Sequence, residues 1–318
     1  MADSKNYERS VIKLGNSMAI TFPQEWFNKT HLKEHSKVSV FPIDDETILI
    51  HKNNYKKGES VIKLDLKDWS SNLFEELILT AFKLSVDKLY LKFEVEKNNK
   101  DYYDMVNNLQ RKIIGFDSSI ISEGNEICIQ FLLDLRRISL PEILIELFNI
   151  INDFINSVID KSSVVNQDIY KEKFSRKYNL GLRILLHTLL KYPNLNNVVN
   201  RPIVRTLGDR ITLLYSKELM DYAFQLKNLP INILDKYSHI LKRISVLLLK
   251  IVQKYNNIQE KTLFSFQKEI DDINSLFSSS NSENDKEEII IRRIISKFLS
   301  ICKDLIGISI TRILEAKL

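Results

Sequence analysis

The sequence contains little cysteine, glycine or proline, and each shortage excludes a class of protein. Two cysteines in 318 residues, Cys128 and Cys302, support neither a disulfide framework nor a thiolate metal site. They fit a reducing compartment, so we expect a cytoplasmic protein. Seven Gly and six Pro are few for this length, which favours long helices over a loop-rich β protein.

Long apolar runs are missing as well. The first ten residues are polar and mixed in charge, without the apolar core of a signal peptide. The apolar stretch Ile244–Val252 is interrupted by Lys250 and is far shorter than the roughly 20 residues that span a membrane. We therefore expect no membrane insertion.

Motifs that carry catalysis are also absent. The sequence has no Gly-rich phosphate loop and no Gly-x-Ser-x-Gly elbow. His31 and His35 follow a short predicted helix without a third ligand nearby, so we expect loop or surface histidines. His187 and His239 have no acid paired with them in sequence. The sequence thus predicts a protein that is not an enzyme and needs no cofactor.

Composition places the chain among globular proteins with two or three domains, since 44% of residues are hydrophobic and 27% are charged. The net charge of +5 permits a nucleic-acid partner without requiring one.

Residues 1–55 predict a small β-rich domain. Gly15-Asn16-Ser17 has the chemistry of a tight hairpin turn between two short strands, and Pro23 suits the start of a short helix. Two more strands follow, joined by a turn at residues 44–46. A unit this small cannot bury enough surface alone, so we expect a homodimer that shares its sheet.

Residues 56–136 predict an α+β connecting domain. Strands are expected at 61–66, 89–95, 118–122 and 127–132, with a turn at 123–125 joining the last two. Between the first two strands, Leu73, Leu77, Phe82 and Leu84 suit a helix. Another is expected near 102–114 and to stop at Gly115.

Residues 137–318 predict only helices, so the fold class is α+β followed by all-α. Apolar residues recur at alternating spacings of three and four, as in antiparallel bundles. Breaks near Asn194, Pro230, Asn256–Asn257 and residues 278–285 indicate about six helices. We interpret them as two three-helix bundles, at about 137–229 and 230–318. One irregular helical domain is the alternative.

The run VIKLGNSMAITFPQEW at residues 11–26 resembles the signature of the SpoVT/AbrB and MazE antitoxin superfamily. Residues 32–38 and 47–50 are similar to that superfamily's later strands. The resemblance covers about the first fifty residues and implies a dimeric β-barrel with swapped hairpins.

The remainder resembles archaeal phosphate uptake regulators, which join this domain to a PhoU-like helical region. Residues 131–140, FLLDLRRISL, are similar to the junction in those proteins. The resemblance implies a transcriptional or phosphate-uptake regulator with PhoU-like bundles that bind partners or signals.

The same resemblance implies DNA binding through the first hairpin, at Arg9, Lys13, Asn16 and Ser17. Cations would contact phosphates, while Asn and Ser would contact phosphates or base edges. The sequence departs from several DNA-binding relatives at Thr21, where they carry a basic residue. Residues 1–52 contain seven Lys or Arg and seven Asp or Glu, so binding is expected to be weak and salt-sensitive. The alternative is that this domain only dimerises.

PhoU bundles typically hold iron or zinc with an acid and an Asp four residues later on one helix face. Here Asp209 keeps the first acid but Leu213 replaces the second, and Arg292 with Ser296 have lost both. Leu182-Arg183 stands where an acid followed by Arg is expected. We therefore predict no multinuclear metal site. Two further pairs of acids lie three residues apart and are interpreted as solvated helix faces, namely Glu218 with Asp221 and Glu269 with Asp272.

Three hypotheses remain open. In the first, the chain binds DNA and regulates transcription or phosphate uptake. In the second, it is an adaptor that controls a phosphate transporter or its signalling proteins by contact, and its first domain only dimerises. The third is a scaffold protein.

Overall fold

The structure is a computed structural model that describes residues 8–42, 48–52, 60–66, 71–92, 99–121, 126–160, 166–190, 203–255, 258–279 and 286–315. The chain divides into two compact units. The first consists mainly of Met1–Gly58, and the second of Glu59–Lys191 with Arg201–Leu318.

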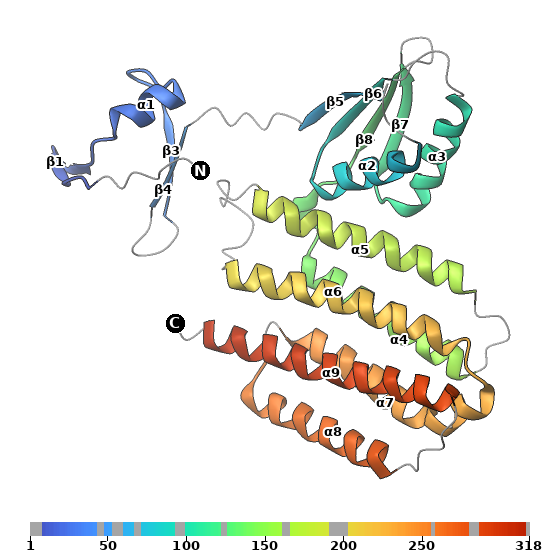
Figure 1. Ribbon diagram of the computed structural model, residues 1–318. Coiled ribbons are helices and arrows are strands. Elements are labelled where there is room, and N and C mark those ends of the chain that lie inside the picture. The colour runs from blue at the N-terminus through green and yellow to red at the C-terminus, as the bar shows by residue number, and fades with distance from the viewer. Residues whose placement is uncertain are drawn as a thin grey trace. The chain divides into compact units, whose positions relative to one another are not determined.

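Two short hairpins and one helix make up the first unit (Figure 1). Strand β1 (Ile12–Leu14) pairs with β2 (Ser17–Ala19), and β3 (Val38–Pro42) pairs with β4 (Ile48–Lys52), both antiparallel. Helix α1 (Gln24–Thr30) lies between the two hairpins in sequence. These described strands form two separate sheets and no closed barrel within one chain, so a barrel of swapped hairpins remains a prediction about two chains.

A four-stranded sheet opens the second unit, with the strand order β5-β6-β8-β7. Its strands are β5 (Val61–Asp65), β6 (Lys88–Lys92), β7 (Phe116–Ile121) and β8 (Glu126–Phe131). Strands β5 and β6 are parallel because a helix crosses between them, whereas β8 is antiparallel to both of its neighbours. The predicted α+β order is thus present.

Helices α2 (Ser71–Lys83) and α3 (Asn99–Lys112) cover one face of this sheet (Figure 1). The buried stripe of α2 consists of Phe74, Ile78, Ala81 and Phe82. Leu73 lies in this helix, as predicted, and is 55% exposed, because these four side chains at helical spacing already fill the contact with the sheet. Leu84, predicted within the same helix, follows its end.

Six helices form the rest of the described second unit. They are α4 (Leu140–Ile159), α5 (Gln167–Leu190), α6 (Ile203–Leu226), α7 (Ile231–Lys254), α8 (Glu260–Ser279) and α9 (Lys286–Glu315). A short 3-10 turn at Leu135–Arg137 precedes them. Pro141 lies in the first turn of α4, where a missing N–H costs no helical hydrogen bond.

These helices pack in two sets of three that share one core. Helices α4, α5 and α6 contact one another, as do α7, α8 and α9. Contacts of α4 with α7 and of α6 with α9 join the sets, and α5 also packs on α2 and α3. The predicted seams of α4 and α7 are buried throughout, from Leu144 to Val158 and from Leu234 to Tyr255. A single hydrophobic core therefore extends from the sheet through all six helices.

Several sequence predictions fall outside the described residues. They are the turns at 44–46 and 123–125 and the breaks at Asn194 and Asn256–Asn257. Within the part of the chain that the structure describes, no helix is long and apolar enough to cross a membrane.

Two helical glycines give a test of the packing. A Cβ on Gly181 would lie 2.8 Å from Cδ2 of buried Leu213, whereas a Cβ on Gly307 would meet nothing within 4 Å. We expect Gly181→Val to lower the free energy of unfolding by about 2 kcal/mol through overpacking between α5 and α6. Gly307→Ala should raise it by about 1 kcal/mol through helix propensity. Urea denaturation of both variants measures this, and a stabilised Gly181→Val would contradict the α5–α6 contact.

Candidate functional site

The first hairpin carries the residues predicted to bind DNA. Leu14 pairs with Ser17 across the strands, so Gly15 and Asn16 form a two-residue loop. Gly15 has φ +62°, the conformation that a type II′ turn requires at its first loop position and that glycine adopts without strain. The turn therefore forms where the sequence predicted it.

Arg9, Lys13, Asn16 and Ser17 all have exposed side chains, on the hairpin or immediately before it. Lys13 lies opposite Met18 in the antiparallel pair. Nη1 of Arg9 donates a hydrogen bond to the carbonyl of Glu8 at 3.3 Å. Lys13, Asn16 and Ser17 thus share one exposed hairpin, and Arg9 lies three residues before it.

The same hairpin exposes large apolar side chains. Leu14 is 69% and Met18 is 72% exposed, and Val11, Ile12 and Ile20 are also exposed. Phe22, two residues before α1, contacts Trp26 and Phe27 of this helix, and these three rings lie at centroid distances of 5.1 to 6.1 Å from one another but remain partly exposed. None of the side chains whose burial is described in this unit is buried. Among the side chains whose burial is described, a single chain therefore shows no buried core in this unit.

Asp209, the remaining acid of the altered metal motif, is 1% exposed and already has a cationic partner. Its Oδ1 accepts hydrogen bonds from the Tyr255 hydroxyl at 2.5 Å and from Nη2 of Arg312 at 2.8 Å. The Arg312 guanidinium also lies over the Tyr255 ring, 4.3 Å from its centroid. An internal guanidinium thus supplies positive charge where the motif would place a metal ion.

Leu213, one helical turn from Asp209, is fully buried against α5 at Gly181. A carboxylate at this position would lie in apolar packing between α5 and α6, at a high desolvation cost. The two halves of the motif therefore take part in different contacts.

The second altered motif, in α9, lies beside another buried acid. Glu288 is fully buried and accepts hydrogen bonds from the Tyr237 hydroxyl at 2.6 Å and from Nζ of Lys236 at 3.0 Å. Arg292 donates to the same hydroxyl at 3.3 Å and lies over the Phe277 ring. Ser296 is exposed. Arg292 is thus held in a polar cluster between α7 and α9.

These hydrogen bonds change the acidity of Glu288. The Tyr237 hydroxyl and then Lys236 hold the pKa of this carboxyl below its usual value of 4.5, although burial acts in the opposite direction. Tyr237 and Lys236 belong to α7 and Glu288 to α9, so ionisation of one acid is linked to the packing of these two helices.

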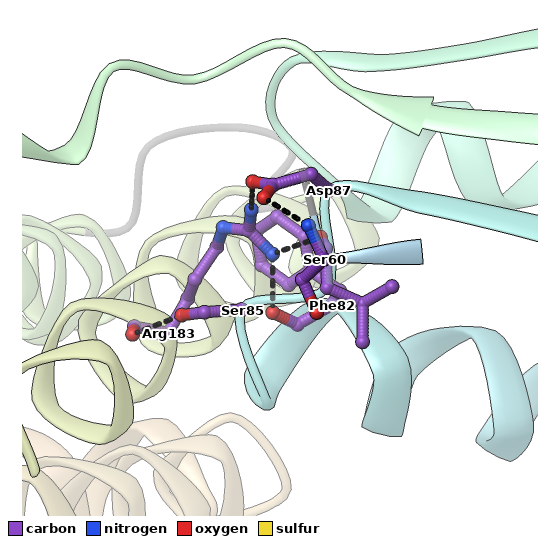
Figure 2. A network of polar contacts seen from close by, with 6 residues as sticks. Ser60, Phe82, Ser85, Asp87 and Arg183 are labelled. Atoms are coloured by element: carbon purple, nitrogen blue, oxygen red, sulfur yellow. Dashed lines mark hydrogen bonds and ion pairs between the residues drawn. The ribbon is translucent and has the colours of Figure 1, made fainter. Parts of the chain in front are cut away.

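Arg183 forms a third polar network, between α5 and the turn after α2 (Figure 2). Its side chain is 1% exposed, and Nη1 donates to the carbonyls of Phe82 at 2.6 Å and Val86 at 3.1 Å. The guanidinium lies over the rings of Phe82 and Phe131. A cation here meets carbonyls at the C-terminal end of α2, where the helix dipole is negative.

Asp87 completes this network (Figure 2). Its Oδ1 lies 3.9 Å from Nη2 of Arg183, and its Oδ2 accepts the backbone N–H of Ser60 at 2.8 Å. Ser85 lies in sequence between Phe82 and Val86 and has φ +61°. Its hydroxyl donates a hydrogen bond to the carbonyl of Arg183 at 3.2 Å. Burial lowers the pKa of Arg183 to about 10, while Asp87 raises it.

Of the other acids considered from sequence, Glu218 and Glu269 pair with cations on neighbouring helices, and Asp221 and Asp272 are exposed. Glu218 lies 2.9 Å from Lys297, and Glu269 lies 3.9 Å from Arg243. The described residues contain no group of three or more His, Cys, Asp or Glu side chains placed to hold a metal ion. His31 and His35 are exposed, and each has a positive φ.

Sequence reasoning missed the partners of these buried charges. Tyr255 and Arg312 lie 46 and 103 residues from Asp209, and Asp87 lies 96 residues before Arg183. No local spacing indicates such contacts. The one available signal was Arg183 itself, a charged residue within an otherwise apolar helical segment.

The described residues define a class of architecture, namely a small unit of two hairpins and a helix, and a larger unit of an α+β segment followed by six helices. Comparison with known proteins finds no matching family, no matching curated protein and no matching solved structure.

The buried pair of Asp209 and Arg312 gives a stability prediction. Arg312→Met leaves the Asp209 carboxylate buried without its cation, so we expect the free energy of unfolding to fall by about 3 kcal/mol. Lys242→Met, which breaks an exposed pair with Asp160, should cost less than about 1 kcal/mol. Chemical denaturation compares the two, and equal costs would show that Asp209 is solvated.

Glu288 gives a prediction of pH dependence. Its pKa is lower in the folded chain, so the unfolded chain binds more protons as the pH falls below about 4.5. Its contribution to stability is therefore complete above that value and is lost as the pH falls through the folded pKa. We expect Glu288→Gln to flatten the fall in urea midpoint below pH 4.5, and Glu142→Gln, at an exposed position, to leave it unchanged. An unaltered slope in Glu288→Gln would contradict the lowered pKa.

Proposed function

We propose that the chain is a non-enzymatic regulator that forms a homodimer through its first unit and binds DNA with the first hairpin. Its helical region, interpreted as two PhoU-like bundles, binds partners or signals. The resemblance at residues 11–26 and 131–140 supports a role in transcription or phosphate uptake. A cytoplasmic location remains a prediction from the cysteine content.

The absence of described buried side chains in the first unit is the observation that carries the homodimer. A folded unit with exposed Leu14 and Met18 and a partly exposed Trp26 gains little from burial within one chain. A second copy that covers this hairpin would bury these side chains. Twofold pairing would also display each Gly15-Asn16 turn beside its counterpart.

DNA binding is supported by the exposed Arg9, Lys13, Asn16 and Ser17 on this hairpin. The two cations can release counterions from phosphates, and the dimer doubles their number. Four cations make a modest electrostatic contribution, so affinity should be weak and should fall with salt with a log–log slope of about −4. Asn16 lies in the exposed loop of the turn, which supports a contact with a base edge.

An adaptor function is the second candidate, and the surface of α6 favours it. Leu207, Ile211 and Leu214 recur at spacings of four and three and are each 40% to 55% exposed. Such a stripe fits an amphipathic helix of a protein partner. In this case the first unit would only dimerise.

Fluorescence anisotropy with a random duplex, titrated with salt, distinguishes the two functions. The wild-type protein should bind at low salt and lose affinity as salt rises, and Lys13→Glu should abolish binding. Lys33→Glu, an equal charge change after α1, should weaken binding by less than about threefold, as for a charge that contacts no phosphate. Light scattering should report a dimer for all three proteins.

If the protein is a dimer but does not bind duplex DNA at low salt, the adaptor function replaces the DNA-binding regulator as the proposal. A monomer at micromolar concentration would exclude both. Leu14→Asp should dissociate the dimer, because it places a charge among apolar side chains, whereas Leu132→Asp changes an equally exposed leucine of the second unit and should have no effect.

A further inference from the structure

Asp87 connects two parts of the second unit that are far apart in sequence. Beyond its side-chain contacts with Ser60 and Arg183, its backbone N–H and that of Lys88 donate to the carbonyl of Ser60, at 2.9 and 3.0 Å. Ser60 is the first described residue after the segment that joins the two units. Asp87 therefore holds the point at which the chain enters the second unit.

Arg183 connects the same carboxylate to the helices. It lies in the middle of α5, which packs on α4 and α6 and on the two helices of the sheet. Ser60 and α5 are thus bridged by two side chains, Asp87 and Arg183 (Figure 2). A movement of α5 relative to the sheet changes the separation of these two charges directly.

The bridge is incompletely satisfied. Nε of Arg183 has no hydrogen-bond acceptor among the described residues, and the 3.9 Å between Nη2 and Oδ1 exceeds a hydrogen bond. Ser85 adopts a left-handed conformation that residues other than glycine rarely take. The surrounding packing therefore holds the network in a geometry that its own interactions do not optimise.

We propose that Arg183 and Asp87 form a joint through which the position of α5 sets the position of Ser60, and with it the attachment of the first unit. A shift of α5 that shortens the separation strengthens the ion pair and fixes Asp87 on Ser60. A shift that lengthens it leaves the guanidinium with two carbonyl acceptors and loosens Asp87. The purpose of this joint rests on the proposed function, since the joint would couple the helical bundles to the first unit, which is proposed to dimerise.

Hydrogen exchange tests the joint without reference to DNA. In Arg183→Met, the amides of Ser60, Asp87 and Lys88 should exchange about tenfold faster, as expected for local opening, while those of α7 and α9 are unchanged. Arg183→Lys should restore part of the protection. Arg243→Met is the matched control, because its pair with Glu269 has the same 3.9 Å separation but both side chains are 29% exposed.

Asp87→Asn provides a second variant if Arg183→Met does not fold. It retains an oxygen for the Ser60 N–H and removes the charge that faces Arg183. Faster exchange at Ser60 in either variant supports the joint. Exchange that changes only in the turn at residues 82–86, or equally throughout the helices, would overturn it.

Single-molecule energy transfer measures the effect on the first unit. Lys33→Cys and Lys250→Cys place dyes on exposed positions of the two units, and both native cysteines are buried. Arg183→Met should broaden or shift the distribution of transfer efficiency, and an unchanged distribution would refute the coupling. If the protein binds no DNA, the proposed regulator fails while the exchange result still decides the joint.

Discussion

Helix α4 is the element on which the second unit depends. It contacts α5 and α6 in its own set of three helices and α7 in the other set, and ten of its twenty residues are buried. Its apolar stripe is wider than a coiled-coil seam, because Ile143, Phe148 and Ile155 are buried beside Leu144, Leu147 and Ile151. Removal of the α4–α7 contact would leave the contact of α6 with α9 to join the two sets of helices.

The buried charges add specificity to this core. Asp209, Glu288 and Arg183 each take a partner from another element, and their partners belong to α9, α7 and the turn after α2. If two helices were packed one turn out of register, each charge would be buried without its partner, which costs several kcal/mol. Aliphatic side chains alone tolerate such shifts more readily, so the polar contacts select one arrangement.

The first unit differs from the second in the exposure of its described apolar side chains. Its first hairpin forms within one chain, since Gly15 satisfies the turn locally, but none of the apolar side chains whose burial is described in this unit is buried. The same residues that would complete a dimer lie beside those proposed to contact DNA. Under the two proposals, dimerisation and DNA binding depend on the same hairpin.

The sequence by itself determined the elements whose signals are local. The turn at Gly15-Asn16, the seams of α4 and α7, and the division at Pro230 follow from turn chemistry, apolar periodicity and a missing N–H, which act within a few residues. Only tertiary structure decided the partners of Asp209, Glu288 and Arg183, and the exposure of Leu73 and of the α6 stripe. Those outcomes depend on which helix and strand faces pack together when the elements are tens of residues apart in sequence. The spacing of residues along the chain does not indicate this packing.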